Sequence, residues 1–495
     1  MKSSVLFQKF SGISGDGDID ISYIQSDTRK ILPGDIFCMN DRFFDKTEAY
    51  AKFARERGAS AILCSEKTAK QISIKKDILL SADDPANLHG PIASFLCGSP
   101  SSRLNITAVT GTNGKTSITH ILADLFSHSG KRCGIIGTIA AKFNGKIIDC
   151  GLTTPEPSTM HRLLQQMENE GIEYVFMEAS SHGLKLGRLE GLEFNAGIFT
   201  NLTPDHMDFH PDIQDYLLSK FHLFELIEKS PKKDKFAVIS SDSAGSSDML
   251  KLFAEKKISY PVIQFGKDRE AEGFLKGLDL HGTAFDFKFR EKKLSLESRL
   301  LGAYNFINVS LSLCVFLQME KDSSDSSVVQ SVLNLKSVEG RFQIVPDRKK
   351  KRIGIVDYAH SPDALENILS SMKEIPNSKL ITVFGCGGDR DRTKRPMMGK
   401  IGAAYSDFLI LTSDNPRTED PMSIISEIEK GIPSEFKNWK KISDRREAIR
   451  EAVKMLPENG LLLVAGKGHE NYQIIGKEKF HFLDSEEIEK AFSEE

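Results

Sequence analysis

The sequence predicts an α/β protein with three domains, each built on its own sheet. Length is the first reason, because 495 residues at about 100 to 200 per domain correspond to roughly three domains. The second is a phosphate-binding pattern at residues 105–117, where a β-branched run meets a glycine turn and then a helical period. The third is the alternation of strands and helices after residue 338, which is typical of a parallel sheet covered by helices. We therefore expect a small α/β domain at 1–98, a P-loop domain with a mainly parallel sheet at 99–338 and a further α/β domain at 339–495.

The composition is that of an ordinary globular protein, with 40% hydrophobic and 27% charged residues. Lys and Arg number 66 against 69 Asp and Glu, a net charge of -3, so the chain as a whole offers no attraction for nucleic acid or membranes. The seven cysteines form no Cys-x-x-Cys pair, which favours a reducing cytosol and argues against a disulfide framework or a zinc site. The first ten residues lack the apolar core of a signal peptide, and no stretch approaches the ~18 apolar residues of a membrane span. We expect a cytoplasmic protein.

The first domain begins with a polar cluster, Ser-Asp-Thr-Arg at residues 26–29, which suits either a capped turn or a binding site. Residues 31–39 then predict a turn into a strand, 48–57 a helix and 59–64 the next strand. The small, polar segment 97–102 is typical of a linker and ends the domain.

The second domain opens on the phosphate-binding pattern. Residues 111–116, Gly-Thr-Asn-Gly-Lys-Thr, have two residues between their glycines where the general P-loop has four, so we interpret them as a shortened P-loop. Backbone N–H groups and a helix N-terminus would face a phosphate there, with Lys115 neutralising the β- and γ-phosphates and the Thr116 hydroxyl binding Mg²⁺. The alternative is a glycine-rich turn with a solvated lysine.

Polar groups also follow the next two predicted strands of this domain. Residues 173–178 form a buried strand ending in Glu178, which could hold the Mg²⁺ of a nucleotide or be a surface acid. Residues 180–188 follow directly and gather hydroxyls, an imidazole and a guanidinium. The strand at 196–200 ends in residues 201–210, where two histidines and two aspartates suit a metal or phosphate oxygens.

Three later features each allow two interpretations. Lys220 has apolar neighbours on the predicted helix 213–229, and by composition alone it is a structural lysine with a solvated tip. Asn305 and Asn308 share a helix face and could bind one ligand together, or act as an N-cap and its neighbour. The basic run at 348–352 joins two predicted strands, which favours an exposed hairpin tip over a nucleic-acid patch.

Four unusual loops follow strands of the third domain. They are residues 357–360, 385–390, 414–417 and 466–470. Because ligands of parallel sheets bind outside the carboxyl ends of the strands, the four loops indicate a single site.

Together these motifs resemble the Mur ligases, the ATP-dependent enzymes that build the stem peptide of peptidoglycan, over essentially the whole chain. The match is closest to the diaminopimelate-adding members of the family. The residues that carry the resemblance are 111–116, 153–154, 177–183, 205–206, 357–362, 385–390, 414–417 and 466–470. The resemblance implies an N-terminal domain that binds the UDP end of the substrate, a central ATPase domain and a C-terminal Rossmann-like domain that receives the amino acid.

The resemblance also assigns roles residue by residue. The catalytic residues it implies are Lys115, Glu178, His206 and Lys220. The implied ligands of two Mg²⁺ ions are Thr116, Glu178, His206 and Lys220, the last as a carbamate formed with CO₂. The implied ATP contacts are Gly111, Thr112, Asn113, Gly114, Lys115, Thr116 and Ser117, with Asn308, Arg341 and Asp357 on the adenosine side.

Two further sets of contacts are carried over. Those for UDP-N-acetylmuramoyl dipeptide are Thr28, Thr153, Thr154, Ser180 and Arg188. Those for diaminopimelate are Arg390, Asp414, Asn415, Pro416, Arg417, Gly466 and Glu470. Leu152 and Leu186 stand where the family commonly has asparagine and glutamine, so neither is assigned a contact.

The activity implied is amide formation. The D-Glu γ-carboxylate of UDP-N-acetylmuramoyl-L-alanyl-D-glutamate attacks the ATP γ-phosphate, and the amine of the amino acid then displaces phosphate from the acyl phosphate. Arg390 and Arg417 suit the distal carboxylate of meso-2,6-diaminopimelate, because a guanidinium pairs with a carboxylate in bidentate fashion. The alternatives are the same ligase adding L-lysine, a ligase like the folylpolyglutamate synthetases, or a nucleotide-binding regulator without turnover. We expect a monomer.

Overall fold

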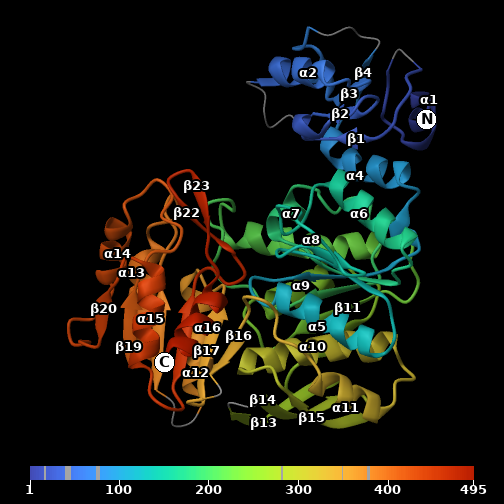
Figure 1. Ribbon diagram of the computed structural model, residues 1–495. Helices are drawn as coiled ribbons and strands as arrows, with labels where there is room; N and C mark the ends of the chain where they lie inside the picture. Colours follow the sequence, from blue (N-terminus) through green and yellow to red (C-terminus); the bar gives the residue numbers. More distant parts are fainter. Residues whose placement is uncertain (16–17, 40–45, 74–77, 280–281, 348, 376–378) are drawn as a thin grey trace. The chain divides into compact units, whose positions relative to one another are not determined.

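The computed structural model describes residues 1–495 except 16–17, 40–45, 74–77, 280–281, 348 and 376–378 (Figure 1). The chain divides into two compact units, Met1–Leu202 with His206–Gln264, and Thr203–Asp205 with Phe265–Glu495. The predicted class is confirmed, because the strands form a small N-terminal sheet, a large mixed sheet and a mainly parallel C-terminal sheet. The domain boundaries stay a prediction. Among the described residues, no helix is both long and apolar enough to cross a bilayer.

The N-terminal sheet has four parallel strands in the order β1-β2-β3-β4. Its strands and helices are α1 (Ser3–Lys9), β1 (Ile24–Gln25), η1 (Thr28–Lys30), β2 (Ile36–Cys38), α2 (Thr47–Glu56), β3 (Ala61–Cys64), α3 (Glu66–Ala69), β4 (Leu79–Ser81) and α4 (Pro85–Leu96). The polar cluster at 26–29 is a capped turn, because the Asp27 side chain accepts a hydrogen bond from the Arg29 N–H at the start of η1.

In the first unit the large sheet runs β8-β7-β6-β9-β5-β10-β11-β12. The strands from β6 to β11 pair in parallel, and β7 and β8 add an antiparallel edge. The elements are η4 (Pro100–Ser102), β5 (Asn105–Thr110), α5 (Lys115–His128), β6 (Cys133–Ile136), β7 (Ala141–Phe143), β8 (Lys146–Ile148), α6 (Pro157–Asn169), β9 (Tyr174–Glu178), α7 (Ser181–Lys185), β10 (Ala196–Phe199), α8 (Ile213–Lys229), β11 (Phe236–Ser240), α9 (Ser246–Glu255) and β12 (Val262–Phe265). Strands β5, β9 and β10 are parallel neighbours and are buried almost throughout. The polar groups that follow them therefore lie at one edge of the sheet.

The second unit contains an antiparallel meander that the sequence analysis did not predict. It consists of β13 (Ala271–Asp279), β14 (Gly282–Phe289) and β15 (Lys292–Ser298), followed by α10 (Ala303–Met319) and α11 (Asp325–Leu333). Burial alternates along β14, so one face of the meander packs on the protein and the other faces solvent.

The C-terminal sheet has the order β16-β17-β21-β18-β19-β20, and all its pairs are parallel except β16 with β17. Its elements are β16 (Gln343–Asp347), β17 (Arg352–Asp357), α12 (Pro362–Lys373), β18 (Leu380–Phe384), α13 (Lys394–Tyr405), β19 (Phe408–Leu411), α14 (Pro421–Glu429), β20 (Trp439–Lys441), α15 (Arg445–Met455), β21 (Leu461–Ala465), β22 (Tyr472–Ile475), β23 (Glu478–His481) and α16 (Asp484–Glu494). The four loops predicted to meet follow β17, β18, β19 and β21, which are neighbours in the sheet.

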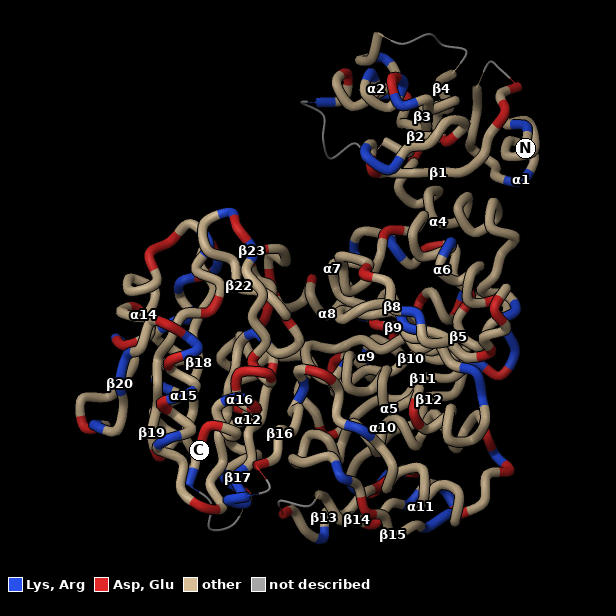
Figure 2. The backbone as a smooth tube through the Cα atoms, viewed as in Figure 1, with Lys and Arg blue, Asp and Glu red and all other residues tan. Residues whose placement is uncertain are grey.

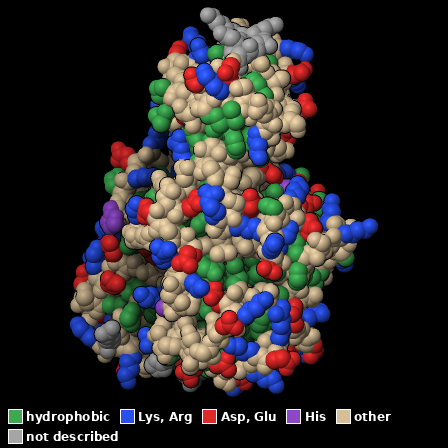
Figure 3. All heavy atoms as spheres, turned by 90° about the vertical axis from the view of Figure 1, so that its right-hand side faces the viewer, with side chains coloured by type: hydrophobic (Ala, Val, Ile, Leu, Met, Phe, Trp, Pro, Cys, Tyr) green, Lys and Arg blue, Asp and Glu red, His purple; other side chains and the backbone are tan. Residues whose placement is uncertain are grey.

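The basic run at 348–352 joins two antiparallel strands, as predicted, although Arg348 lies outside the described residues. The prediction of an exposed tip is wrong for Arg352, because its side chain is buried and its Nε lies 2.6 Å from Asp347 Oδ2. In the view of Figure 2, Lys and Arg are interspersed with Asp and Glu along the chain, and neither sign dominates. On the face drawn in Figure 3, hydrophobic side chains occur in small groups between charged ones.

Candidate functional site

The predicted P-loop connects β5 to α5, and its backbone needs glycine. Gly111 has φ +146°, and a Cβ there would lie 1.8 Å from Thr200 Oγ1. Gly114 has φ +88° and stands directly before the first residue of α5, Lys115. The loop therefore ends at a helix N-terminus, the arrangement that binds phosphate through backbone N–H groups.

Two residues at the end of β10 hold this loop. Asn201 accepts the Thr112 N–H through its carbonyl at 3.0 Å and the Asn113 N–H through its side chain at 3.0 Å. The Thr200 hydroxyl donates to the Asn113 carbonyl at 2.6 Å. Sequence reasoning missed both roles. The available signal was their position after a buried strand, which is where the loops of a parallel sheet meet.

Lys115 curls back over the loop, and its Nζ donates to the Gly111 carbonyl at 2.9 Å and the Thr112 carbonyl at 2.8 Å. The ammonium is thus held beside the backbone that would surround a phosphate. The interpretation of a solvated lysine does not describe this geometry, because the side chain is only partly exposed and bonds the loop itself.

Glu178 is buried at the end of β9, which excludes the alternative of a surface acid. Its Oε1 accepts from the Thr116 hydroxyl at 3.0 Å and from the Thr138 N–H at 2.8 Å, and its Oε2 accepts from the Thr138 hydroxyl at 3.0 Å. Gly137 leaves room for the carboxylate, since a Cβ there would lie 2.2 Å from Oε1. Thr138 is a third residue that the sequence analysis missed.

Lys220 lies inside the protein, which corrects the expectation of a solvated tip. Its side chain is 1% exposed, and its Nζ donates to the Gly111 carbonyl at 2.8 Å. The same ammonium lies 4.1 Å from the centre of the Tyr216 ring. Helix α8 therefore brings a lysine to the P-loop.

His206 belongs to a group of aromatic side chains at the start of α8. Its ring lies 6.3 Å from that of Tyr216 and 4.8 Å from that of His182. Burial, with the neighbouring His206 and His210, lowers the pKa of His182 to about 4. His210 joins this loop to α8, because its Nδ1 lies 2.6 Å from Asp215 Oδ2 and its Nε2 lies 3.0 Å from Ser181 Oγ.

The side-chain oxygens of Thr116 and Glu178 are of the kind that a magnesium ion binds. Thr116 Oγ1 and Glu178 Oε1 are 3.0 Å apart, the separation of neighbouring oxygens around an octahedral ion with bonds of about 2.1 Å. Among the described residues no group of three or more His, Cys, Asp or Glu is placed to hold a metal. A site built here would need the hydroxyl of Thr116 and a modified Lys220 besides Glu178 and His206.

The residues assigned to the muramyl dipeptide lie together beside Glu178. Thr153 Oγ1 is 3.0 Å from Thr138 Oγ1, and Thr154 Oγ1 is 3.0 Å from Ser180 Oγ. The Arg188 guanidinium donates to the Thr154 carbonyl at 3.2 Å. Thr154 itself is fully buried and also donates to the Glu178 carbonyl at 2.9 Å, so it holds the site together rather than presenting its hydroxyl.

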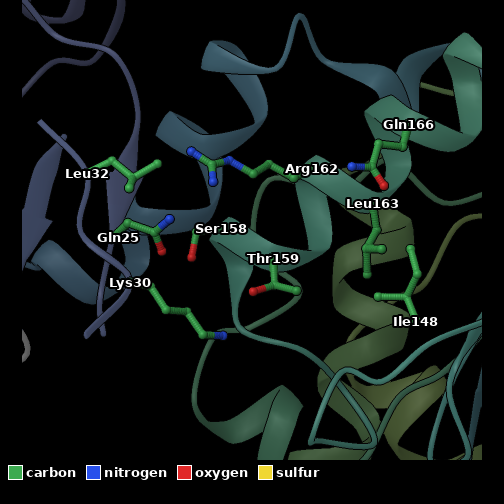
Figure 4. A pocket seen from close by; sticks show the side chains of 9 residues that line it. All are labelled: Gln25, Lys30, Leu32, Ile148, Ser158, Thr159, Arg162, Leu163 and Gln166. Atoms are coloured by element: carbon green, nitrogen blue, oxygen red, sulfur yellow. The ribbon is translucent and has the colours of Figure 1, made fainter. Parts of the chain in front are cut away.

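A cavity of about 420 Å³ lies between η1 and α6 of the same unit (Figure 4). Its basic groups are Lys30, from η1, and Arg162, from α6, whose guanidinium lies 3.9 Å from the centre of the Tyr23 ring. The full lining is Gln25, Lys30, Leu32, Ile148, Ser158, Thr159, Arg162, Leu163 and Gln166. Thr28, a predicted contact of the UDP-N-acetylmuramoyl dipeptide, does not line the cavity but begins η1, the helix that carries Lys30.

The three residues assigned to adenosine belong to the second unit. Burial raises the pKa of Asp357, whose oxygens accept the Phe342 and Ala359 N–H groups at 2.8 Å each. The Arg341 guanidinium lies 4.5 Å from the centre of the Tyr358 ring. Asn308 donates to Asn305 at 3.3 Å inside α10, and the helix N-cap is Gly302, so the capping alternative for the two asparagines is wrong.

The loops assigned to the amino acid contact one another. The Arg417 Nη1 donates to the Gly388 carbonyl at 2.7 Å, and Asn415 Nδ2 donates to Glu470 Oε2 at 2.7 Å. A Cβ on Gly466 would lie 2.6 Å from Asp414 Oδ2. Arg390 is exposed, and Pro416 is buried between these loops.

A buried ion pair holds the ends of two strands behind these loops. Arg445 donates through Nε and Nη2 to Asp484 at 2.8 Å each, and both side chains are fully buried. The same guanidinium donates to the Ser413 and Ala465 carbonyls at 3.4 and 2.9 Å. These carbonyls immediately precede the 414–417 and 466–470 loops, so the pair fixes where both loops start.

Comparison with known proteins agrees with this geometry. The model of the Mur ligase middle domain matches residues 109–316, and that of the Mur ligase glutamate ligase domain matches residues 340–468. A UDP-N-acetylmuramoyl-L-alanyl-D-glutamate 2,6-diaminopimelate ligase from Leptospira borgpetersenii is 46% identical over 479 residues, covering 96% of this chain and 94% of that protein. A ligase of the same name from Leptospira interrogans is 45% identical over 501 residues, covering 99% and 97%.

Solved structures give the same result. A structure of a ligase with that name superposes with a TM-score of 0.67 at 30% identity, covering 96% of this chain and 95% of the other. A folylpolyglutamate synthase from Mycobacterium tuberculosis superposes with a TM-score of 0.63 at 16% identity, covering 76% of this chain and 91% of the other. The second similarity is one of fold alone.

Proposed function

The chain belongs to the Mur ligase family, and from that premise we propose that it joins meso-2,6-diaminopimelate to UDP-N-acetylmuramoyl-L-alanyl-D-glutamate with hydrolysis of ATP to ADP and phosphate. The observation that carries the proposal is the similarity to diaminopimelate ligases over nearly the full length of both chains. The product is a UDP-N-acetylmuramoyl tripeptide, a precursor of peptidoglycan.

The choice of diaminopimelate over L-lysine is supported by Arg417. Its Nη1 is taken by the Gly388 carbonyl, while its Nε and Nη2 make no hydrogen bond to any described residue. These two groups form one edge of the guanidinium, the edge that binds a carboxylate in bidentate fashion. L-lysine has no carboxylate at its distal end and would leave that edge unpaired.

The first unit supplies the groups that activate the γ-carboxylate of D-glutamate. Two anions must approach each other when this carboxylate attacks the ATP γ-phosphate, so the site must offset negative charge. Lys115 and the N–H groups of residues 111–117, apart from those of Thr112 and Asn113 that Asn201 accepts, would do this at the P-loop. Thr153, Ser180 and Arg188 lie beside Glu178, where they would hold the dipeptide end of the substrate, while Thr28 would contact the uridine nucleotide.

Two Mg²⁺ ions, held by Thr116, Glu178, His206 and a carbamate on Lys220, would supply the remaining positive charge when bound. Thr138 keeps the Glu178 carboxylate in place, and the P-loop carbonyl of Gly111 fixes the position of the Lys220 nitrogen. Asn308, Arg341 and Asp357 would bind the adenosine. The amine of diaminopimelate then displaces phosphate from the acyl phosphate, with its distal end held by Arg390, Arg417 and Glu470 near Asp414, Asn415, Pro416 and Gly466.

The experiment that tests the proposal measures ADP release and product mass with ATP, Mg²⁺ and UDP-N-acetylmuramoyl-L-alanyl-D-glutamate. We expect release with meso-diaminopimelate, and a product heavier by one diaminopimelyl residue. Release that responds equally to L-lysine would reassign the amino acid, and release that requires a folate would favour a folylpolyglutamate synthetase. Absence of release with all three substrates would favour a regulator. We also propose that the protein acts in the cytoplasm. We further propose that it is a monomer, which sedimentation of the purified chain tests.

A further inference from the structure

Two residues outside the assigned amino-acid contacts make hydrogen bonds to the loops 414–417 and 466–470, which would form the amino-acid pocket. The first is Lys467, whose side chain is fully buried. Its Nζ donates to Asn415 Oδ1 and to Glu470 Oε2, at 3.2 Å each. Because Asn415 Nδ2 also donates to Glu470 Oε2 at 2.7 Å, the three side chains form a closed triangle.

The second is Gln473, which lies on the β22–β23 hairpin. Its Nε2 donates to the Asp414 carbonyl at 2.7 Å. The next residue, Ile474, donates its N–H to Asn415 Oδ1 at 2.9 Å. The hairpin therefore bonds the 414–417 loop at its first two residues.

The hairpin also fixes the backbone of Arg417. The Arg417 N–H donates to the Ile474 carbonyl at 3.1 Å, and its carbonyl accepts the Gly476 N–H at 2.7 Å. Arg417 has φ +52°, a left-handed conformation that residues other than glycine seldom adopt. The two bonds to the hairpin hold it there and so aim its side chain.

In these loops, some side-chain atoms hold the loops together, whereas others are placed to bind a ligand. Both ends of the Asn415 side-chain amide are engaged, because its nitrogen donates to Glu470 and its oxygen accepts from Lys467 and Ile474. By contrast, Glu470 Oε1 makes no hydrogen bond with any residue that the structure describes, as is true of Nε and Nη2 of Arg417. A carboxylate oxygen and a guanidinium edge are the partners that suit the ammonium and carboxylate of an amino-acid end.

We propose that Lys467 and Gln473 are positioning residues of the amino-acid pocket, and that the β22–β23 hairpin sets how well this pocket separates an amino acid with a distal carboxylate from one without. The proposal rests on the proposed function. A bidentate pair tolerates displacements of only about 0.5 Å. A substitution that loosens the loop carrying Arg417 therefore weakens binding of the amino acid, even though the substituted residue does not contact the substrate. Both residues belong to the second unit, whereas the P-loop belongs to the first.

A partial reaction separates this role from a loss of folding. Without an amino acid, the acyl phosphate formed from ATP and the dipeptide can be trapped with hydroxylamine, whose nitrogen displaces phosphate and leaves a hydroxamate. This step does not use the amino-acid pocket. We therefore compare Lys467→Met and Gln473→Leu with the matched control Lys477→Met, an exposed lysine between β22 and β23.

For Gln473→Leu we expect KM for diaminopimelate to rise at least tenfold and the preference for diaminopimelate over L-lysine to fall. Hydroxamate yield and the KM values for ATP and UDP-dipeptide should stay within twofold of wild type, as all values should for Lys477→Met. Lys467→Met should show a larger KM change, and its melting temperature is recorded because the site is buried. If Lys467→Met does not fold, Gln473→Leu decides.

An unchanged KM for diaminopimelate in Gln473→Leu, or a hydroxamate yield that falls in parallel with it, overturns the positioning role. Failure of the proposed function itself is seen separately, as wild-type protein that forms no tripeptide. Wild-type turnover together with unaltered variants therefore rejects only the inference about the hairpin and Lys467.

Discussion

Replacing Arg417 with alanine tests the basis of amino-acid selection. The variant removes the Nε–Nη2 edge that would pair with the distal carboxylate, together with the Nη1 bond to the Gly388 carbonyl. A hydrogen bond to a charged group contributes about 1.5 to 3 kcal/mol, and a partly solvated bidentate pair about 3 kcal/mol in total. At 1.4 kcal/mol per factor of ten, kcat/KM for diaminopimelate should fall about 100-fold. L-lysine forms no such pair, so its kcat/KM should change by less than about threefold on the same reasoning.

The assay is ADP release at saturating ATP and UDP-dipeptide, with each amino acid varied in turn. Arg450→Ala serves as the control, because Arg450 is an exposed arginine of the same sheet domain that pairs with Glu494 at 3.4 Å. It should leave both amino acids unaffected. A loss for diaminopimelate below about fivefold, or an equal loss for both amino acids, would refute the role given to the guanidinium edge.

Three other predictions concern the first unit. Gly111→Ala should abolish ATP turnover and weaken ATP binding in calorimetry, since the added Cβ would lie 1.8 Å from Thr200 Oγ1; tight ATP binding would contradict the P-loop assignment. Lys220→Ala should lose more than about 100-fold in kcat and regain activity with added short-chain carboxylates, whereas a lysine acting as a cation would show no such rescue. Burial lowers the pKa of His161 to about 4 and that of His89 to about 3, below the unfolded value of 6.5. Both therefore stabilise the fold fully above pH 6.5 and less as the pH falls, by about 2 kcal/mol each between pH 6.5 and pH 5, which urea unfolding measures; His161→Phe should flatten the curve.

The sequence was sufficient where a short segment determines its own structure. The helix predicted at 213–229 has the observed bounds, because an amphipathic period and an Asp212 cap define it locally. The shortened P-loop was recognisable for the same reason, since its two glycines and Lys115 lie within one turn. The four loops of the last domain were predicted to meet because parallel strands end at one edge, a rule that needs only their order.

The sequence was insufficient where a contact joins distant segments. Thr138 holds Glu178 from 40 residues away, and Lys467 holds Asn415 from 52 away. Each is an ordinary residue in its local sequence, and only the packing of strands brings the pairs together. Lys220 was misjudged for the same reason, because its burial depends on the P-loop that covers it.

The carboxylates of Glu178 and Glu470 differ in what holds them, and the difference matches the ligands proposed for each. Within the described residues, the Glu178 carboxylate accepts hydrogen bonds only from neutral donors, the Thr116 hydroxyl and the Thr138 N–H and hydroxyl. None of these donors carries a positive charge that would offset the carboxylate, which suits a ligand of a divalent cation. Glu470 is held by the ammonium of Lys467, which offsets that charge. A carboxylate neutralised in this way attracts a lone cation weakly but can still accept a hydrogen bond, so beside Arg417 it favours an end that carries both an ammonium and a carboxylate. Diaminopimelate has such an end, and L-lysine has only the ammonium.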